Sequence, residues 1–308
     1  MEITYKNKRY YSLNEYFKQR FNKKVFKVAL NAGFTCPNKT GKAGFGGCTF
    51  CSPTGSGDFA GDKEDNLITQ FETIKQLMHK KWPKAKYIAF FQANTNTYAP
   101  VDILREKFEK ILNYHKDIIG LSIATRADCL EADVIEYLAE LNTKTNLFVE
   151  LGLQTVHEKT AKLINRGHDY QTFIDGVSKL RSKNIETIAH IINGLPYETK
   201  EDMIKTVKDL VKLDIQGIKI HLLHVIENTR MGSEYLSNPF PLLTKDEYID
   251  IVVKQLELIP PHIVIHRLTG DAVREDLIGP MWSLKKWEIL NGIDNELKIR
   301  NTYQGRLS

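Results

Sequence analysis

The chain has 308 residues, 42% of them apolar and 26% charged, which is enough for one large or two small globular domains and excludes disorder as its main state. No apolar run approaches the roughly 18 residues of a membrane span, and the first residues lack a signal segment, so we expect a cytoplasmic protein without a membrane partner. Forty-three Lys and Arg against 38 Asp and Glu give a net charge of +5. That balance permits a polyanionic partner without requiring one.

Residues 1–24 form a basic, aromatic N-terminal arm with a capping-box pattern from Ser12 to Glu15. This composition suits contact with a nucleic-acid backbone and its bases, but equally an amphipathic helix that covers the protein core. The residues on which both interpretations rest are Lys6, Lys8, Arg9, Lys18, Arg20, Lys23, Lys24 and Lys27, among Tyr5, Tyr10, Tyr11, Tyr16, Phe17 and Phe21.

From residue 25 to 228 the chain alternates between apolar β-type runs and amphipathic helical patterns. This alternation predicts a parallel α/β architecture with right-handed crossovers. Six such units are too few for a closed eight-stranded barrel, so we predict a partial (β/α)6 TIM-like barrel with its site at the C-terminal ends of the strands. The expected strands are 25–30, 87–91, 118–124, 147–153, 186–192 and 217–224, and the expected helices are 66–80, 101–114, 132–141, 170–183 and 201–213.

The remaining residues, 229–308, depart from this rhythm. A second capping box at Thr244 and Glu247 predicts a helix to about residue 258, and an apolar run predicts a strand at 263–267. We expect this C-terminal α/β extension to pack on the core rather than to fold separately.

Three of the four cysteines lie within sixteen residues, with the spacing C-x11-C-x2-C, in a glycine-rich loop after the first predicted strand. Without an export signal, these residues point to metal ligation rather than to disulfides. Cys36, Cys48 and Cys51 suit either zinc or an iron–sulfur cluster. A closed zinc site needs a fourth ligand, for which Cys129 is the candidate, although a buried structural thiol is the simpler interpretation of Cys129. Three ligands would leave one iron of a [4Fe-4S] cube open.

Further motifs follow the cysteines in order. They are TRAD from Thr125 to Asp128, ELGLQT from Glu150 to Thr155, NRGH from Asn165 to His168, the segment from His190 to Pro196, and the segment from Lys219 to Thr229. Together with the cysteines they resemble the radical S-adenosylmethionine (SAM) superfamily. The likeness extends to the radical SAM domain of the elongator catalytic subunit, and over the full length to a bacterial family of the YhcC/YtqA type.

The resemblance implies a [4Fe-4S] cluster held by Cys36, Cys48 and Cys51, with SAM on the open iron. Reductive cleavage of SAM would give a 5′-deoxyadenosyl radical that abstracts a substrate hydrogen. It also implies a reductase such as flavodoxin or ferredoxin, and tRNA as the partner. The expected reaction converts wobble 5-carboxymethylaminomethyl-uridine to 5-aminomethyl-uridine.

The same resemblance suggests which residues contact SAM. Gln92 and Asn94, within a segment that stands where relatives have Gly-Gly-Glu, would meet its ammonium group. Gln154 would reach the ribose, and Arg166 would pair with the carboxylate. Further ribose contacts are expected from Thr125, Glu150 and Asn193.

Alternatives remain open at this stage. The enzyme could act on a small molecule or a protein, or the chain could be a non-catalytic zinc-stabilised nucleic-acid-binding protein that uses Cys129. A histidine zinc set is disfavoured, because His221 and His224 are three apart on a predicted strand and should face opposite sides. The other members of that set are His262 and His266, and a polar stretch with Asp271, Arg274 and Glu275 could close the site.

Overall fold

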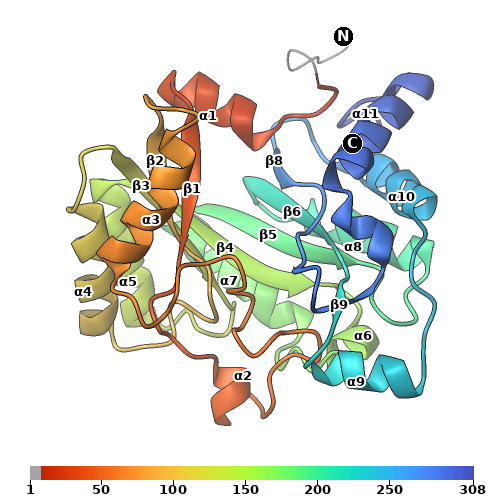
Figure 1. Cartoon of the computed structure of the whole chain (residues 1–308), viewed down its shortest axis with the longest axis horizontal. Coiled ribbons are helices and arrows are strands. Elements are labelled where there is room, and N and C mark those ends of the chain that lie inside the picture. The colour runs from red at the N-terminus through yellow and green to blue at the C-terminus, as the bar shows by residue number, and fades with distance from the viewer. Residues whose placement is uncertain (1–7) are drawn as a thin grey trace.

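The computed structural model describes residues 8–308, so Tyr5 and Lys6 of the predicted arm lie outside the described residues. Seven strands form a single parallel sheet in the order β1-β2-β3-β4-β5-β6-β8, curled into a partial barrel (Figure 1). The strands are β1 (Val25–Leu30), β2 (Lys86–Phe91), β3 (Ile118–Thr125), β4 (Asn146–Gln154), β5 (Glu186–Asn193), β6 (Gly217–Leu222) and β8 (Val264–Arg267).

The crossover helices cover the outer face of this sheet. Their apolar sides pack on its buried residues in one continuous core that includes Phe71, Phe108, Leu138, Phe173 and Val207. The helices are α3 (Leu67–His79), α4 (Val101–Leu112), α5 (Ala132–Lys144), α6 (Glu158–Leu163), α7 (Tyr170–Ser182) and α8 (Lys200–Leu210). The predicted partial-barrel class is therefore confirmed, and each predicted strand and helix of the core is present with ends shifted by a few residues.

The strand count differs from the prediction. We expected six strands, but β8, from the C-terminal extension, pairs in parallel with β6 and becomes the seventh. Without β8, the outer edge of β6 would expose unpaired backbone groups. A second, two-stranded antiparallel ribbon pairs β7 (Val225–Ile226), at the end of the core, with β9 (Leu277–Gly279) of the extension. The helical elements of the extension are α9 (Arg230–Ser237), α10 (Lys245–Leu258), η1 (Met281–Leu284) and α11 (Lys286–Ile299). The predicted capping box of Thr244 and Glu247 begins α10.

The described part of the N-terminal arm forms α1 (Leu13–Phe21), which begins at the predicted cap Ser12 and lies across one end of the barrel. Its Phe17 is 3% exposed and packs with Val25, Ile88, Phe148 and Ile188 at the N-terminal ends of the strands. The short helix α2 (Pro37–Thr40) and the cysteine loop lie at the opposite end (Figure 1).

Several basic residues predicted to contact nucleic acid are used within the protein. Arg20 pairs with Glu186, Lys8 pairs with Asp294, and Lys24 lies 5.4 Å from the centre of the Trp82 ring. These contacts favour the covering-helix interpretation of the arm.

No helix among the described residues is both long enough and apolar enough to cross a membrane.

Candidate functional site

The side chains that face the barrel axis form layers, because alternate residues of a strand point to the same side. The layer nearest α1 is apolar and contains Val25, Ile88, Phe148 and Ile188. Two residues further along the strands lie Lys27, Phe90, Ser122, Glu150, His190 and Lys219. Two residues further again, the side chains reach a cavity at the C-terminal ends of the strands, where the fold class predicts the site.

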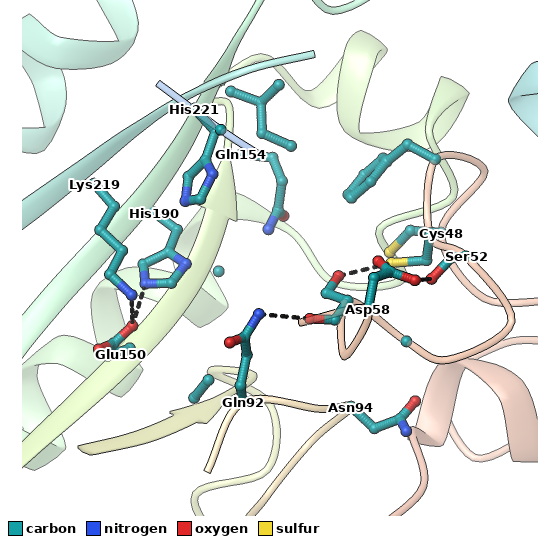
Figure 2. A pocket seen from close by; sticks show the side chains of 18 of the residues that line it. Cys48, Ser52, Asp58, Gln92, Asn94, Glu150, Gln154, His190, Lys219 and His221 are labelled. Atoms are coloured by element: carbon teal, nitrogen blue, oxygen red, sulfur yellow. Dashed lines mark hydrogen bonds and ion pairs between the residues drawn. The ribbon is translucent and has the colours of Figure 1, made fainter. Parts of the chain in front are cut away.

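This cavity has a volume of about 300 Å³, and its lining residues range from Cys36 in the cysteine loop to Asp271 in the C-terminal extension. Its lining includes all three clustered cysteines and five of the seven predicted SAM-contacting residues, Gln92, Asn94, Thr125, Glu150 and Gln154. Figure 2 shows Cys48 on one side and Lys219, His190 and His221 across the cavity, with Gln92 and Gln154 between them.

The cysteine wall is a loop shaped by its glycines. Gly46 and Gly47 both have positive φ, which lets the chain turn back after α2. Cys36 precedes α2 at its N-cap, and the Cys51 amide donates to the Cys48 carbonyl at 3.0 Å. A hydrogen bond from the Cys48 thiol, supported by Ser56 and the charge of Lys39, lowers the pKa of Cys51 to about 7 although burial opposes this. The same hydrogen bond raises the pKa of the Cys48 thiol, so the pair favours a single thiolate, on Cys51.

Hydrogen bonds from Gln92 and Asn94 hold this loop against the end of β2. The Gln92 side-chain amide donates to the Ser56 carbonyl at 2.8 Å, and the Asn94 backbone amide donates to the Gly55 carbonyl at 2.8 Å. A Cβ on Gly55 would lie 1.9 Å from the Asn94 side-chain oxygen, so only glycine permits this approach. Both residues line the cavity beside the cysteines, as expected for contacts to a group bound there.

Gln154 ends β4 with a φ of +62°, at an irregularity in the pairing with β5. Its side chain points into the cavity (Figure 2). A Cβ on Gly152 would lie only 2.6 Å from the Gln154 amide nitrogen, so the glycine makes room for this orientation. Thr125 ends β3, and its hydroxyl lies 2.5 Å from that of Thr97.

Glu150 lies in the charged layer below the cavity, and all its hydrogen-bonding capacity is used. One carboxylate oxygen accepts from Lys27 at 2.5 Å and Ser122 at 2.6 Å, while the other accepts from His190 at 2.7 Å and from Lys219. A carboxylate with four donors has no capacity left for a ribose hydroxyl. The predicted ribose contact of Glu150 therefore does not fit, and its role is to hold Lys219 and His190.

Burial and neighbouring charges shift the titration of this layer. Burial acts against the Glu150 carboxylate, but the charges of Lys219 and Lys27 hold its pKa well below the usual range. Burial lowers the pKa of Lys219 to about 7 and that of His190 to about 4, in each case against the attraction of Glu150. His190 is therefore a neutral imidazole at pH 7.

Two predicted contacts lie outside the cavity lining. Arg166 is 1% exposed, and its guanidinium donates to the carbonyls of Leu153, Thr155 and His168. Asn193 is also 1% exposed and exchanges hydrogen bonds with the Gln255 side chain. Asn193 is thus committed to Gln255, while Arg166 uses Nε and Nη1 on backbone carbonyls and its buried Nη2 has no hydrogen-bond partner among the described residues. Neither side chain lines the cavity in which the predicted direct contacts to SAM would be made.

The zinc alternative through Cys129 also fails. Cys129 is 1% exposed and absent from the cavity lining, and burial raises the pKa of its thiol. Among residues 8–308, no three His, Cys, Asp or Glu side chains converge where a single metal ion could sit.

The prediction that His221 and His224 face opposite sides is wrong. His221 and His224 line the same cavity, because β6 ends at Leu222 and strand alternation stops there.

Several lining residues were not assigned by sequence reasoning. His190, Lys219 and Arg267 line the cavity and had no assigned role. Lys27, grouped with the basic arm, lies outside the lining and points into the barrel, where it donates to Glu150. One signal could have identified the charged layer. Lys27, Glu150, His190 and Lys219 each interrupt an otherwise apolar strand, where a charged or titratable residue requires a buried partner.

Comparison with known proteins gives the family. Residues 37–210 match the model of the Radical SAM superfamily, and residues 215–299 match the Radical_SAM C-terminal domain. The chain is 56% identical over 299 residues to protein YtqA of Bacillus subtilis, covering 97% of this chain and 92% of YtqA. It is 31% identical over 292 residues to protein YhcC of Escherichia coli K12, covering 94% and 93%. Elongator complex protein 3 of Dictyostelium discoideum matches at 26% identity over 157 residues, which is 50% of this chain and 27% of that protein.

Among solved structures, the archaeal Elp3 of Methanocaldococcus infernus with an N-terminal deletion superposes with a TM-score of 0.68 at 17% identity. The match covers 92% of this chain and 64% of that one, and it supports the fold alone. The family matches, a cysteine loop at the C-terminal end of a partial barrel and a cavity beside it define one class of protein. This chain belongs to the radical SAM superfamily, so it is an enzyme whose cofactors are a [4Fe-4S] cluster and SAM. The resemblance inferred from the motifs is thereby confirmed.

Proposed function

We propose that this enzyme modifies tRNA by converting wobble 5-carboxymethylaminomethyl-uridine to 5-aminomethyl-uridine, with its cluster held by Cys36, Cys48 and Cys51. Loss of a hydrogen atom and of a second electron from the carboxymethyl CH2 carbon, with the oxidised cluster as electron acceptor, followed by addition of water, would release that group as glyoxylate and leave the amine. The observation that carries the proposal is a cavity with thiols on one wall and Lys219, His190 and His221 on the wall opposite (Figure 2). When bound, the reduced cluster and SAM supply the radical that takes a hydrogen atom from the substrate. A flavodoxin- or ferredoxin-type reductase would supply the electron.

The three cysteines fit a cluster better than a single ion. They line one wall, and they lie in a loop whose glycines allow the backbone to wrap a bulky group. Three protein ligands would leave one position of the cluster free to bind SAM.

Gln92, Asn94, Gln154 and Thr125 line the cavity, and in this proposal they would orient SAM. Their amides and hydroxyl suit the ammonium and ribose groups of the cofactor. Each side chain belongs to a strand end or to the turn after it, so the barrel fixes its position.

Support for tRNA as the substrate comes from the motif likeness to the elongator catalytic subunit and from the YhcC/YtqA-type family. It does not come from the basic arm, because α1 lies at the opposite end of the barrel from the cavity. A tRNA would therefore approach the end that carries α2 and α9.

The test compares modified nucleosides of tRNA from strains with and without the gene, measured by mass spectrometry. We expect 5-carboxymethylaminomethyl-uridine to accumulate in the deletion strain and the normal profile to return with the wild-type gene but not with Cys48→Ala. An unchanged wobble-uridine profile would contradict the tRNA proposal. A small-molecule or protein substrate would then be preferred, with the same radical chemistry.

A further inference from the structure

The cavity wall formed by β6, β8 and the turns that follow them carries polar groups that no step above uses. Arg267 ends β8 and is the register partner of Lys219 on β6. His221, two residues beyond Lys219, points into the cavity across from Cys48 (Figure 2). His224 and Gly270 complete this corner of the lining.

Two of these side chains are incompletely satisfied. The Nε2 atoms of His221 and His224 are buried and have no hydrogen-bond partner among the described residues. A buried polar atom without a partner costs about 1–3 kcal/mol, so its persistence in a cavity wall indicates a bound group that supplies the partner. Gly270 is required at this place, because a Cβ there would lie 2.8 Å from the His224 ring.

Both carboxylates on this wall are paired with lysines. Glu150 pairs with Lys27 and Lys219, and Asp271 pairs with Lys286. Glu150 is saturated by its four donors, and both oxygens of Asp271 accept from Lys286, at 2.7 and 2.9 Å. Arg267 reaches Asp271 only at 3.4 Å, longer than the 2.7–2.9 Å typical of a charge-assisted hydrogen bond.

The Arg267 guanidinium therefore has N–H groups that are available to donate hydrogen bonds to a further acceptor. Burial, and then the charge of Arg267, hold the pKa of His221 well below its usual range, so this imidazole is neutral and can donate one hydrogen bond without adding charge.

We propose that Arg267, together with His221 and His224, binds a carboxylate group of the substrate on the wall opposite the cysteines. The identity of that substrate rests on the function proposed above, in which the carboxylate belongs to the carboxymethyl group of the modified uridine. Arg267 is then a specificity-determining residue contributed by the C-terminal extension. It distinguishes 5-carboxymethylaminomethyl-uridine from the product, which has lost the whole carboxymethyl group and with it the carboxylate.

The same chemistry could serve the carboxylate of SAM instead, so the test measures both ligands on the reconstituted holoenzyme under anaerobic conditions. For Arg267→Met we expect the KM for the tRNA substrate to rise about 10- to 100-fold, with an unchanged Kd for SAM. The KM of Arg267→Lys should lie between those of wild type and Arg267→Met, because lysine keeps the charge but cannot donate two parallel hydrogen bonds to a carboxylate. Arg306→Met, exposed and outside the cavity lining, is the matched control and should behave as wild type. A normal substrate KM in Arg267→Met, or a raised Kd for SAM alone, would overturn the proposal.

A second measurement separates this proposal from the tRNA function. N-methylglycine carries the same secondary amine and carboxymethyl group, and its binding to the SAM-loaded wild-type enzyme can be followed by calorimetry against N-methylglycinamide. We expect binding of N-methylglycine alone, and its loss in Arg267→Met. If wild-type enzyme leaves tRNA unmodified yet binds N-methylglycine through Arg267, the tRNA function fails while the carboxylate site stands. If N-methylglycine and its amide bind equally, or neither binds, the carboxylate site is refuted.

Discussion

The two walls of the cavity are built in opposite ways. The cysteine wall comes from one short loop, in which backbone hydrogen bonds and glycines with positive φ set the positions of Cys36, Cys48 and Cys51. The facing wall, which we call the strand wall, is formed by side chains of strands that are far apart in sequence. These side chains meet only when the barrel forms. Lys27 and Lys219 reach the same carboxylate from β1 and β6. A loop wall can hold a cofactor through local sequence alone, whereas a strand wall depends on the whole fold.

The largest expected effect comes from removing one cysteine of the loop wall. Cys48→Ala should leave the protein without a stable cluster and without 5′-deoxyadenosine above background, because the two remaining thiols cannot hold the cube. Cys129→Ala removes a buried thiol outside the cavity and should keep both properties. Iron and sulfide content and SAM cleavage after anaerobic reconstitution give the answer. Loss of the cluster in both variants would contradict the assignment of Cys48 as a cluster ligand and of Cys129 as a residue that does not bind the cluster.

The next effect concerns the stability of the strand wall. Glu150→Gln leaves Lys27 and Lys219 buried without their counter-charge, which should lower the free energy of unfolding by about 3 kcal/mol. The matched control is Glu140→Gln, since Glu140 also pairs with two basic residues, Arg105 and Lys144, but on the surface. Urea unfolding of both variants should show a clearly smaller loss for the surface carboxylate. Equal losses would mean that the buried layer is not a stabilising unit.

The strand wall should also respond to acid. The folded-state pKa of His190 is about 4, below the ordinary 6.5, so the unfolded chain binds the extra proton first. Stability contributed by the neutral imidazole is complete above pH 6.5 and falls as the pH drops towards 4, by up to about 1.4 kcal/mol per pH unit. His190→Gln should show a shallower loss of unfolding free energy between pH 6.5 and 5 than wild type. Parallel curves of unfolding free energy against pH for the two proteins would refute the lowered pKa of His190 in the folded state.

The smallest expected effect tests the space between the walls. Gly152→Ala should push the Gln154 side chain out of its position, because the added Cβ would lie 2.6 Å from its amide nitrogen. We expect a several-fold weaker Kd for SAM with little change in stability, since the displaced atom is the end of a flexible side chain. Gln154→Ala should weaken SAM to a similar extent, and the double variant should be no worse than either single one. Fully additive losses in the double variant would show that Gly152 acts by another route.

The same contrast explains what the sequence could predict. Cysteine spacing, the strand-and-helix rhythm and the ordered motifs are local signals, so the partial barrel, the family and the position of the cavity followed from them. Arg166 and Asn193 were misplaced, because a motif shows that a residue lies near a strand end but not whether its side chain turns towards the cavity or towards neighbouring backbone. The charged layer and Arg267 were missed for the converse reason. Their partners lie on other strands, and the pairing of β8 with β6 is not visible in either segment alone.

The central claim is that one cavity brings the radical-generating wall and a substrate-binding wall together. The most direct measurement is a single-turnover anaerobic reaction of the reconstituted, reduced enzyme with tRNA bearing 5-carboxymethylaminomethyl-uridine, in which 5′-deoxyadenosine and the wobble nucleoside are quantified together. We predict that 5-aminomethyl-uridine appears in proportion to 5′-deoxyadenosine and that this tRNA accelerates SAM cleavage. Formation of 5′-deoxyadenosine at the same rate with and without the tRNA, with the nucleoside unchanged, would contradict the claim.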